Sequence, residues 1–248
     1  MKKTSLTGAV FAVLAALMMS LPAQAQNYWN KDMPDGWAKS GAGGDNGIML
    51  AIDAGYPDVK LNFLKSGESA DFGAFFNFTY QMFDWSDLGL QLGANMRFSL
   101  SKSEKWDLSL QVNPGIEFYF YDGGYGGYYD EPTLFGLLVD IRLLAGIQIV
   151  PRFRVHAGIA IPIEIIFAGT DNFNDWALPW FSLPILANGG VEFKITPKIS
   201  VNADVRLGPG FKFGPQSDWW DYDYYDEGDE DMGAWFDYRV TVGVAFLF

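Results

Sequence analysis

The chain has 248 residues, with 17 basic and 30 acidic side chains, a formal net charge of −13 and no cysteine. A net negative chain without a basic run is a poor partner for nucleic acid, because phosphate repels it. The lack of cysteine excludes a disulfide framework and a thiolate metal site. Hydrophobic residues make up 49% and aromatic residues 17% of the chain.

The first 25 residues predict a secretory signal peptide. Lys2 and Lys3 form a positive start, an apolar run covers 9–19, and Ala23 and Ala25 give the small-x-small pattern of a cleavage site. The apolar run is too short to span a bilayer, which disfavours the alternative of a retained anchor helix. We expect cleavage after Ala25. Loss of the two lysines then changes the net charge from −13 to −15.

Downstream of residue 46, apolar and polar residues alternate in long segments. Side chains on a strand point to opposite faces in turn, so this pattern predicts β-strands with one apolar face. Nine segments carry it clearly: 47–56, 71–83, 87–100, 106–121, 133–149, 153–167, 180–195, 199–213 and 233–248. A weaker tenth strand is predicted at 59–65, after the turn Tyr56-Pro57-Asp58. An even number of strands returns both termini to one side, so we predict ten strands, with eight as the alternative.

In the nine clear segments the charged residues lie on one face, with Asp87 at a strand edge set aside. They are Asp53, Arg97, Asp107, Glu117, Asp140, Arg142, Arg154, Glu164, Glu192, Lys194, Asp204, Arg206, Lys212, Asp237 and Arg239. A soluble β-sandwich also alternates, but its strands average about five or six residues, and these run to about fifteen. A charge facing lipid costs about 2–4 kcal/mol at mid-bilayer, so strict exclusion is typical of a lipid-facing wall.

The connections alternate between short and long. Short turns are predicted at 101–105, 150–152 and 196–198, and long ones at 122–132, 168–179 and 214–232. Short periplasmic turns and long extracellular loops are the rule in transmembrane barrels. The sequence therefore predicts an all-β protein, a transmembrane antiparallel up-and-down β-barrel over 47–248.

The C-terminal strand resembles the signal by which outer-membrane proteins are recognised for assembly. Its alternate apolar residues are Tyr238, Val240, Val242, Val244, Phe246 and Phe248. With the signal peptide and the hairpin rhythm, the mature chain resembles the small bacterial outer-membrane β-barrel proteins of the OmpA-barrel and OmpX-like kind, in the porin-like superfamily. The resemblance implies an outer-membrane location, with residues 26–46 as a polar periplasmic segment. It implies as partners outer-membrane lipid and lipopolysaccharide, the barrel-assembly machinery and periplasmic chaperones.

Enzymatic barrels need a histidine as proton carrier at neutral pH, and this chain has only His156. It follows the turn at 150–152 closely, which places it near the periplasmic rim, whereas omptin-like active sites lie at the extracellular end. We expect a lumenal histidine bonded to neighbours such as Glu192, no catalytic residues and no cofactor.

An acidic loop lies at 218–231. Its acids are Asp218, Asp221, Asp223, Asp226, Glu227, Asp229, Glu230 and Asp231. Carboxylates suit Ca²⁺ or Mg²⁺, but the order of residues does not fit an EF-hand. The favoured interpretation is a solvated acidic loop, with a divalent-cation loop as the alternative.

The remaining candidate site is a network of charges in the lumen. It consists of Asp140, Arg142, Arg154, His156, Glu164, Glu192, Asp204, Arg206, Asp237 and Arg239. Buried charges must pair and hydrogen-bond, which favours a salt-bridged plug over a pore. Inward glycines would either make room for long arginines or leave a narrow wet path. The leading hypothesis is a non-enzymatic envelope or loop-presenting protein, ahead of a narrow channel for small solutes and an outer-membrane enzyme.

Overall fold

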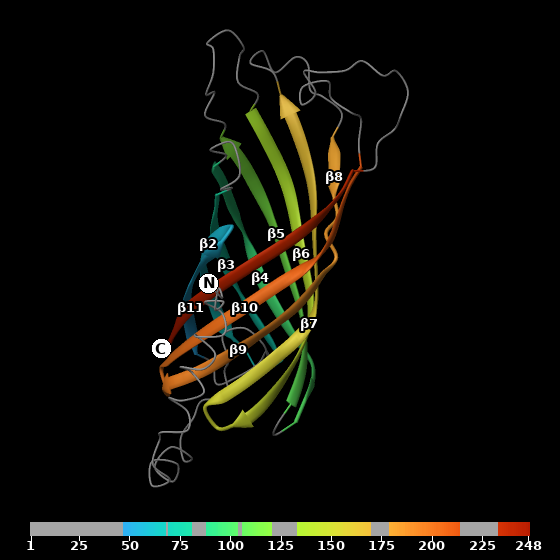
Figure 1. Cartoon of the computed structure of the whole chain (residues 1–248). Coiled ribbons are helices and arrows are strands. Elements are labelled where there is room, and N and C mark those ends of the chain that lie inside the picture. The colour runs from blue at the N-terminus through green and yellow to red at the C-terminus, as the bar shows by residue number, and fades with distance from the viewer. Residues whose placement is uncertain are drawn as a thin grey trace, which may run out of the picture. The chain divides into compact units, whose positions relative to one another are not determined.

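The computed structural model describes residues 47–67, 69–80, 88–103, 106–120, 133–169, 179–213 and 233–248, and these residues form one antiparallel sheet. Its strands are β1 (Ile48–Tyr56), β2 (Asp58–Ser66), β3 (Ala70–Tyr80), β4 (Leu88–Lys102), β5 (Trp106–Phe120), β6 (Thr133–Val150), β7 (Phe153–Gly169), β8 (Trp180–Ser182), β9 (Leu186–Thr196), β10 (Ile199–Phe213) and β11 (Gly233–Leu247). β1 pairs with β11, so the sheet closes into a barrel (Figure 1). In the described ranges no helix has the length and apolarity needed to span a bilayer.

The two short elements β8 and β9 are one strand of the wall. Both pair with β7 on one side and with β10 on the other, and the register does not shift between them. That register sets Pro162 of β7 opposite Pro184, and neither proline has an N–H to donate to the ladder. On the other side Leu183 and Ile185 still donate to β10, each at 2.8 Å. The wall therefore has ten strands.

The ten-stranded antiparallel barrel predicted from the sequence is confirmed. The weak strand predicted at 59–65 is β2, and the strand predicted at 199–213 has those bounds as β10. The segment predicted as one strand at 180–195 differs, because the proline pair interrupts its ladder. The signal peptide, the segment 26–46, the acidic loop and residues 81–83 lie outside the described residues.

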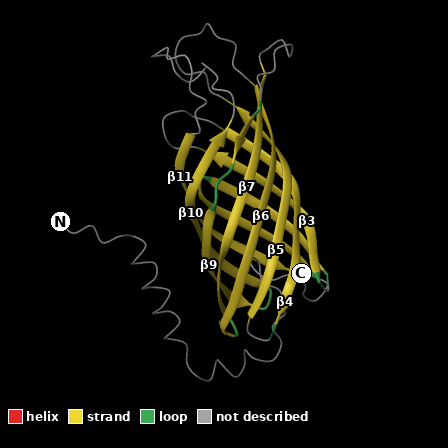
Figure 2. Cartoon of the chain, turned by 90° about the vertical axis from the view of Figure 1, so that its right-hand side faces the viewer, coloured by secondary structure: helices red, strands yellow, loops and turns green. Residues whose placement is uncertain are grey.

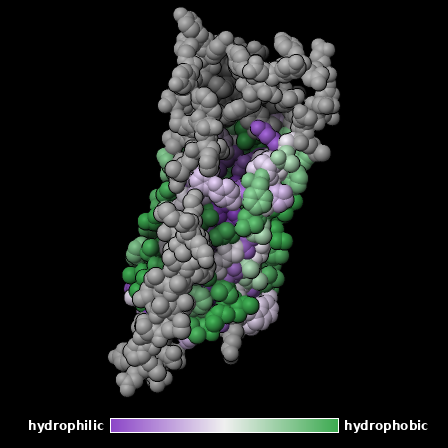
Figure 3. Space-filling model, in the orientation of Figure 1, coloured by the Kyte–Doolittle hydropathy of each residue, from purple (hydrophilic) through white to green (hydrophobic). Residues whose placement is uncertain are grey.

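The barrel is apolar outside and polar inside. Val242, predicted to face outward, is 60% exposed, whereas Arg206 and Asp140, predicted to face inward, are each 6% exposed. Figure 3 shows hydrophobic residues over the flanks of the described wall, with the hydrophilic ones gathered between them. A soluble protein buries its large apolar residues and exposes its charges. The inverse arrangement suits hydrocarbon, and a closed sheet leaves no backbone edge unpaired in lipid, so this is a transmembrane barrel.

The two ends of the barrel differ. One end, here called the turn end, carries Phe248 and the short turns at 151–152 and 197–198. At the other end, here called the loop end, the connections 81–87, 121–132, 170–178 and 214–232 lie outside the described residues. The loop end also holds the short turn between β1 and β2, at Pro57. Figure 2 shows the strands crossing obliquely between the two ends.

A small apolar cluster forms part of the lumen floor at the turn end. Met49, Ala51, Leu64 and Ala245 are each at most 3% exposed, and Leu247 packs against them. These residues come from β1, β2 and β11, which are neighbours in the wall. The lumen on this side is therefore lined by hydrocarbon near the turn end.

Val242→Arg should destabilise the barrel by about 2–4 kcal/mol, because the exposed outward position lies near the middle of the apolar belt. Val150→Arg, at the end of β6 beside a short turn, is the matched control and should cost about 0–1 kcal/mol near the interface. Folding free energies measured in lipid vesicles check both values. Equal effects of the two substitutions would contradict the assignment of the belt.

Candidate functional site: the polar lumen

The inward charges fall into two groups along the barrel. The lower lumen holds six acids and six bases: Asp53, Asp71, Asp107, Asp140, Glu192, Asp204, Lys60, Arg97, Arg142, Arg154, Lys194 and Arg206. The upper lumen, nearer the loop end, holds four acids and one base: Asp58, Glu117, Glu164, Asp237 and Arg239. Lys212 lies beyond them at the exposed rim of β10. The lower lumen is thus formally neutral, and the upper lumen is negative.

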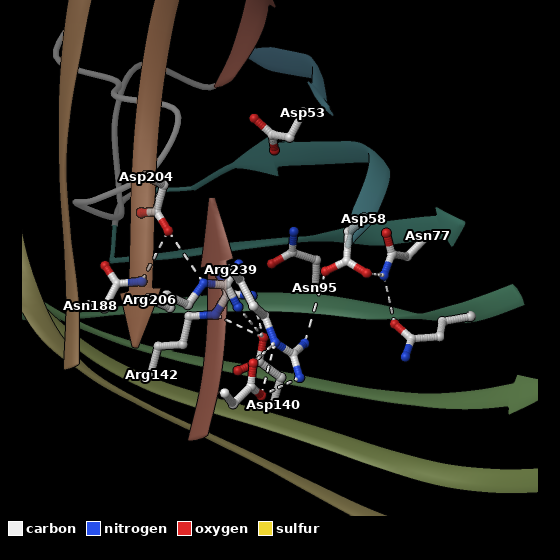
Figure 4. A network of polar contacts seen from close by, with 12 residues as sticks. Asp53, Asp58, Asn77, Asn95, Asp140, Arg142, Asn188, Asp204, Arg206 and Arg239 are labelled. Carbon is white, nitrogen blue, oxygen red and sulfur yellow. Dashed lines mark hydrogen bonds and ion pairs between the residues drawn. The ribbon is translucent and has the colours of Figure 1, made fainter. Parts of the chain in front are cut away.

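A line of ion pairs crosses the lower lumen from β6 to β10 (Figure 4). Arg142 binds Asp140 on the same strand. Arg206 of β10 lies 3.8 Å from Asp140 and 3.3 Å from Asp204. Since β7 and β9 lie between β6 and β10 in the wall, the Arg206–Asp140 contact crosses part of the lumen. The guanidinium group of Arg206 therefore links two strands that share no backbone ladder.

His156 joins this line at its β10 end. Its Nε2 lies 2.8 Å from Asp204 Oδ2, and Asn188 donates to the other oxygen of that carboxylate at 3.2 Å. The ring reaches β10 across β9 because Gly190 lies between, where a Cβ would come within 2.7 Å of the ring. The expected contact of His156 with Glu192 is wrong.

Glu192 instead accepts a hydrogen bond from the hydroxyl of Ser200 at 2.9 Å. In the described part of the chain, the Nδ1 atom of His156 has no hydrogen-bond partner. A histidine that activates a nucleophile needs a hydroxyl or thiol within hydrogen-bond reach. The contacts of His156 thus fit a buried structural hydrogen bond with Asp204.

In one other ion pair of the lower lumen, a glycine makes room for the long side chain. Arg154 of β7 crosses Gly146 of β6 to bind Asp107 of β5. Arg97 binds Asp71 across the β3–β4 ladder at 2.5 Å. The prediction that inward glycines seat long arginines therefore holds at Gly146, whereas Gly190 seats a histidine ring.

On the side formed by β1 to β5, hydrogen-bonded amides accompany the Arg97–Asp71 ion pair. Asn95 donates to Asn62 and Asn62 donates to Asp53, both at 3.1 Å. Each amide donates a hydrogen bond to the next side chain, and the last acceptor is the carboxylate of Asp53. The side chains are buried, so the hydrogen bonds remove most of their desolvation cost.

A second amide ladder lies closer to the loop end. Asn77 donates to Asp58 at 3.1 Å and to Gln91 at 2.8 Å. Gln91 in turn donates to Glu117 at 2.9 Å. The upper ladder therefore runs from β2 to β5 with a carboxylate at each end.

A cavity of about 40 Å³ lies where the amide side meets the ion-pair side. Its lining includes Asn62 and Asn95 from one side and Arg142 and Arg206 from the other. Thr241 also lines it, with a buried hydroxyl that has no hydrogen-bond partner among the described residues. A water needs about 10–15 Å³ on this measure, so the cavity has room for about three. It is polar enough to hold them.

All ten residues of the predicted lumen network occupy inward-facing positions, at different levels of the lumen. Arg154 pairs with Asp107 in the lower lumen, and Arg239 pairs with Asp237 in the upper lumen. The sequence reasoning missed Asp58 and Lys60 because the periodicity of β2 was weak, and it passed over Asp71 at the start of β3. The Tyr56-Pro57-Asp58 turn was the signal that could have placed the first two.

In the described ranges, no group of three or more histidine, aspartate or glutamate side chains is arranged to hold a metal ion. The acidic loop at 218–231 lies outside those ranges. The prediction of a divalent-cation loop therefore stays a prediction.

No family model matches the chain, and no curated protein matches it at a significant level. Among solved structures, it is similar to the translocator domain of the autotransporter NalP from Neisseria meningitidis, with 11% identity and a TM-score of 0.46, over 96% of this chain and 98% of that chain. It is also similar to the outer membrane protease OmpT from Escherichia coli, with 10% identity and a TM-score of 0.34, over 82% of this chain and 94% of that chain. At these values neither likeness carries an argument about activity.

Arg206→Ala should destabilise the barrel by about 3–5 kcal/mol, because it leaves buried carboxylates with less compensating charge. Arg206→Ala combined with Asp204→Asn should cost less than the sum of the two single changes, since the pair is in contact. Arg152→Ala, in an exposed turn contact with Ile195, is the control and should stay within about 0.5 kcal/mol. Folding free energies in lipid test this, and a harmless Arg206→Ala would indicate a hydrated lumen.

Proposed function

We propose that the mature chain is an integral protein of the bacterial outer membrane with a non-enzymatic role, in which a closed barrel supports the envelope or presents surface loops. The observation that carries this proposal is the filled lower lumen. Most of the charged side chains there are almost fully buried, and ion pairs join Arg97, Arg142, Arg154 and Arg206 to carboxylates. A cavity among them has a volume of about 40 Å³.

The lower lumen is an unfavourable path for ions. An ion crossing it would have to separate pairs such as Arg206 and Asp140, and breaking a buried pair costs about 3–5 kcal/mol. The apolar cluster around Met49 and Leu64 adds a dry section on the β1–β2 side. Pairing and packing together favour a plug over a pore.

The outer membrane is the proposed location because the transmembrane barrel coincides with a predicted signal peptide at 1–25 and a C-terminal aromatic residue, Phe248. The outward row from Tyr238 to Phe248 lies on the exposed face of β11. We propose that this row is read by the barrel-assembly machinery after periplasmic chaperones deliver the chain. Outer-membrane lipid and lipopolysaccharide would then contact the belt.

A narrow channel for small solutes is the second candidate, favoured by the polar cavity between Arg142, Arg206 and Thr241. This cavity lies where the amide side and the ion-pair side face each other. Side chains that moved apart along this seam would open a wet path.

Planar-bilayer recordings distinguish the two candidates. We expect no regular single-channel steps from the wild-type chain, because the ion pairs and the apolar cluster close the lumen. Arg206→Ala combined with Arg142→Ala should produce small steps if the seam is the narrowest point. Regular steps of one size from the wild-type protein would favour the channel.

Mature protein should fractionate with the outer membrane and migrate faster unheated than boiled, because a closed barrel resists detergent. Deletion of Phe248 should slow the appearance of the fast-migrating form, whereas Phe248→Tyr, which keeps an aromatic ring, should not. Recovery of the protein from the soluble periplasmic fraction would contradict the location. Assembly of the deletion variant at the wild-type rate would contradict the assigned role of Phe248.

A further inference from the structure

The cavity of about 40 Å³ in the lumen is bordered by more basic than acidic side chains. Its charged lining residues are four bases and two acids: Lys60, Arg97, Arg142, Arg206, Asp53 and Asp58. The carboxylates that form ion pairs with the three arginines do not line it: Asp71, Asp140 and Asp204. The described lining therefore has an excess of two positive charges, although the lower lumen as a whole is neutral.

The ion pairs leave several N–H donors of the arginines without an acceptor. Arg142 binds Asp140 through Nε and Nη2. Arg206 donates to Asp204 through Nε at 3.3 Å, and its contact with Asp140, at 3.8 Å, is too long for a hydrogen bond. In the described part of the chain, Nη1 of Arg142 and both Nη atoms of Arg206 thus make no hydrogen bond. Both side chains point into the lumen (Figure 4), and the residues are only 8% and 6% exposed.

Two uncharged side chains of the lining also lack partners. Thr241 is 5% exposed, and its hydroxyl makes no hydrogen bond with any described residue. Asn113 is 2% exposed, and its carbonyl oxygen likewise lacks a partner among those residues. Buried polar groups are normally hydrogen-bonded. Unpartnered groups from β5, β6, β10 and β11 around one space therefore indicate a small polar occupant.

Apolar side chains limit the cavity on the side of the turn end. Ala51 and Leu64 belong to the apolar cluster of that end and also line the cavity. Hydrocarbon supplies no hydrogen bond, so little water can gather there, and electrostatic interactions are stronger than in bulk water. Positive charge in such surroundings costs free energy, which an anion in the cavity would offset.

We propose that this cavity binds a small monovalent anion of the size of chloride. The excess of positive charge selects an anion, and the unpartnered N–H and O–H groups are donors that a halide accepts. The cavity has room for about three waters, so a halide fits together with water, which would satisfy the carbonyl oxygen of Asn113. A phosphate or sulfate ion has more heavy atoms and exceeds this space. The site goes beyond the envelope role, and its tests do not depend on location or conductance.

The position of the cavity should make exchange of the bound anion slow. The upper lumen, which is negative overall, lies between the cavity and the loop end. Its acids repel an anion that approaches from that end, because like charges in a confined space are poorly screened. We expect the anion to enter while the barrel folds and to remain as part of the filled lumen.

Chloride-dependent folding tests the proposal. The full mature chain is folded reversibly in uncharged detergent while chloride replaces gluconate at constant ionic strength and pH. Gluconate carries the same charge but is too large for the cavity. A ligand that binds only the folded state raises the folding equilibrium constant as its concentration exceeds its dissociation constant. We expect a rise of about tenfold when chloride reaches about ten times that constant, and no rise in gluconate alone.

Two variants each remove one part of the site. Thr241→Val replaces the hydroxyl by a methyl group of similar shape, and Lys60→Met removes one positive charge of the lining. Each should reduce the chloride-dependent rise to about twofold or less, since a hydrogen bond to a charged group is worth about tenfold in affinity. The matched controls are Ser200→Ala and Lys194→Met, at buried inward positions of the lower lumen outside the lining. Both should keep the full rise, and heat-dependent migration checks that each variant is folded.

Three results would overturn the proposal. Equal folding constants in chloride and in gluconate would show that water alone fills the cavity. The same loss of the chloride effect in Lys194→Met as in Lys60→Met would indicate a general salt effect rather than a site. The third concerns crystals grown in bromide, whose anomalous signal should place one ion within hydrogen-bond reach of Thr241. Bromide found only on the outside of the barrel would be an adventitious ion only.

Discussion

Closure of the sheet by β1 and β11 is the constraint on which the rest of the structure depends. In hydrocarbon no water can satisfy an exposed backbone N–H or C=O, so a sheet can cross a membrane only when its first and last strands pair. Eight residue pairs join Met49–Tyr56 to Val240–Leu247. Once this pairing is made, alternation of side chains sends one row of every strand into lipid and the next into a confined lumen.

Ten strands enclose a lumen that side chains can still reach across. Arg206 contacts Asp140 across two intervening strands, and Arg154 reaches Asp107 across one. Such contacts need space beneath the long side chain, and a glycine on the intervening strand supplies it at Gly146 and Gly190. The glycines are therefore part of the ion-pair network even though they carry no polar side chain.

The fold was largely predictable from sequence because a lipid-facing row tolerates no charge, and this rule acts at every second residue of long strands. β10 illustrates the success, since alternate apolar residues placed it with its observed bounds. The partners inside the lumen were not predictable in the same way. His156 was expected at Glu192, but the register sets His156 and Asp204 on either side of Gly190, whose missing side chain lets them meet.

The alternation of side chains along a strand determines which residues face inward. Which of these residues touch depends on how neighbouring strands are shifted against each other and on the side-chain rotamers. Neither can be derived from the sequence of one strand alone. The amide ladders were not predicted from the sequence, for a related reason. Asn62, Asn77 and Gln91 are common residues with no motif, and only the cross-strand register places their donors beside the next acceptor.

The unequal strands have a consequence for the surrounding lipid. β1 has 9 residues and β6 has 18. At about 3.3 Å per residue and a tilt of about 40°, the apolar row of β1 covers about 20 Å of bilayer depth, whereas the row from Leu137 to Ile149 covers about 30 Å. A bilayer of uniform thickness cannot match both sides. Hydrophobic mismatch of this size is relieved by leaning the barrel axis or by thinning the leaflet beside the short hairpin, so the membrane around this protein is expected to be thinnest at β1 and β2.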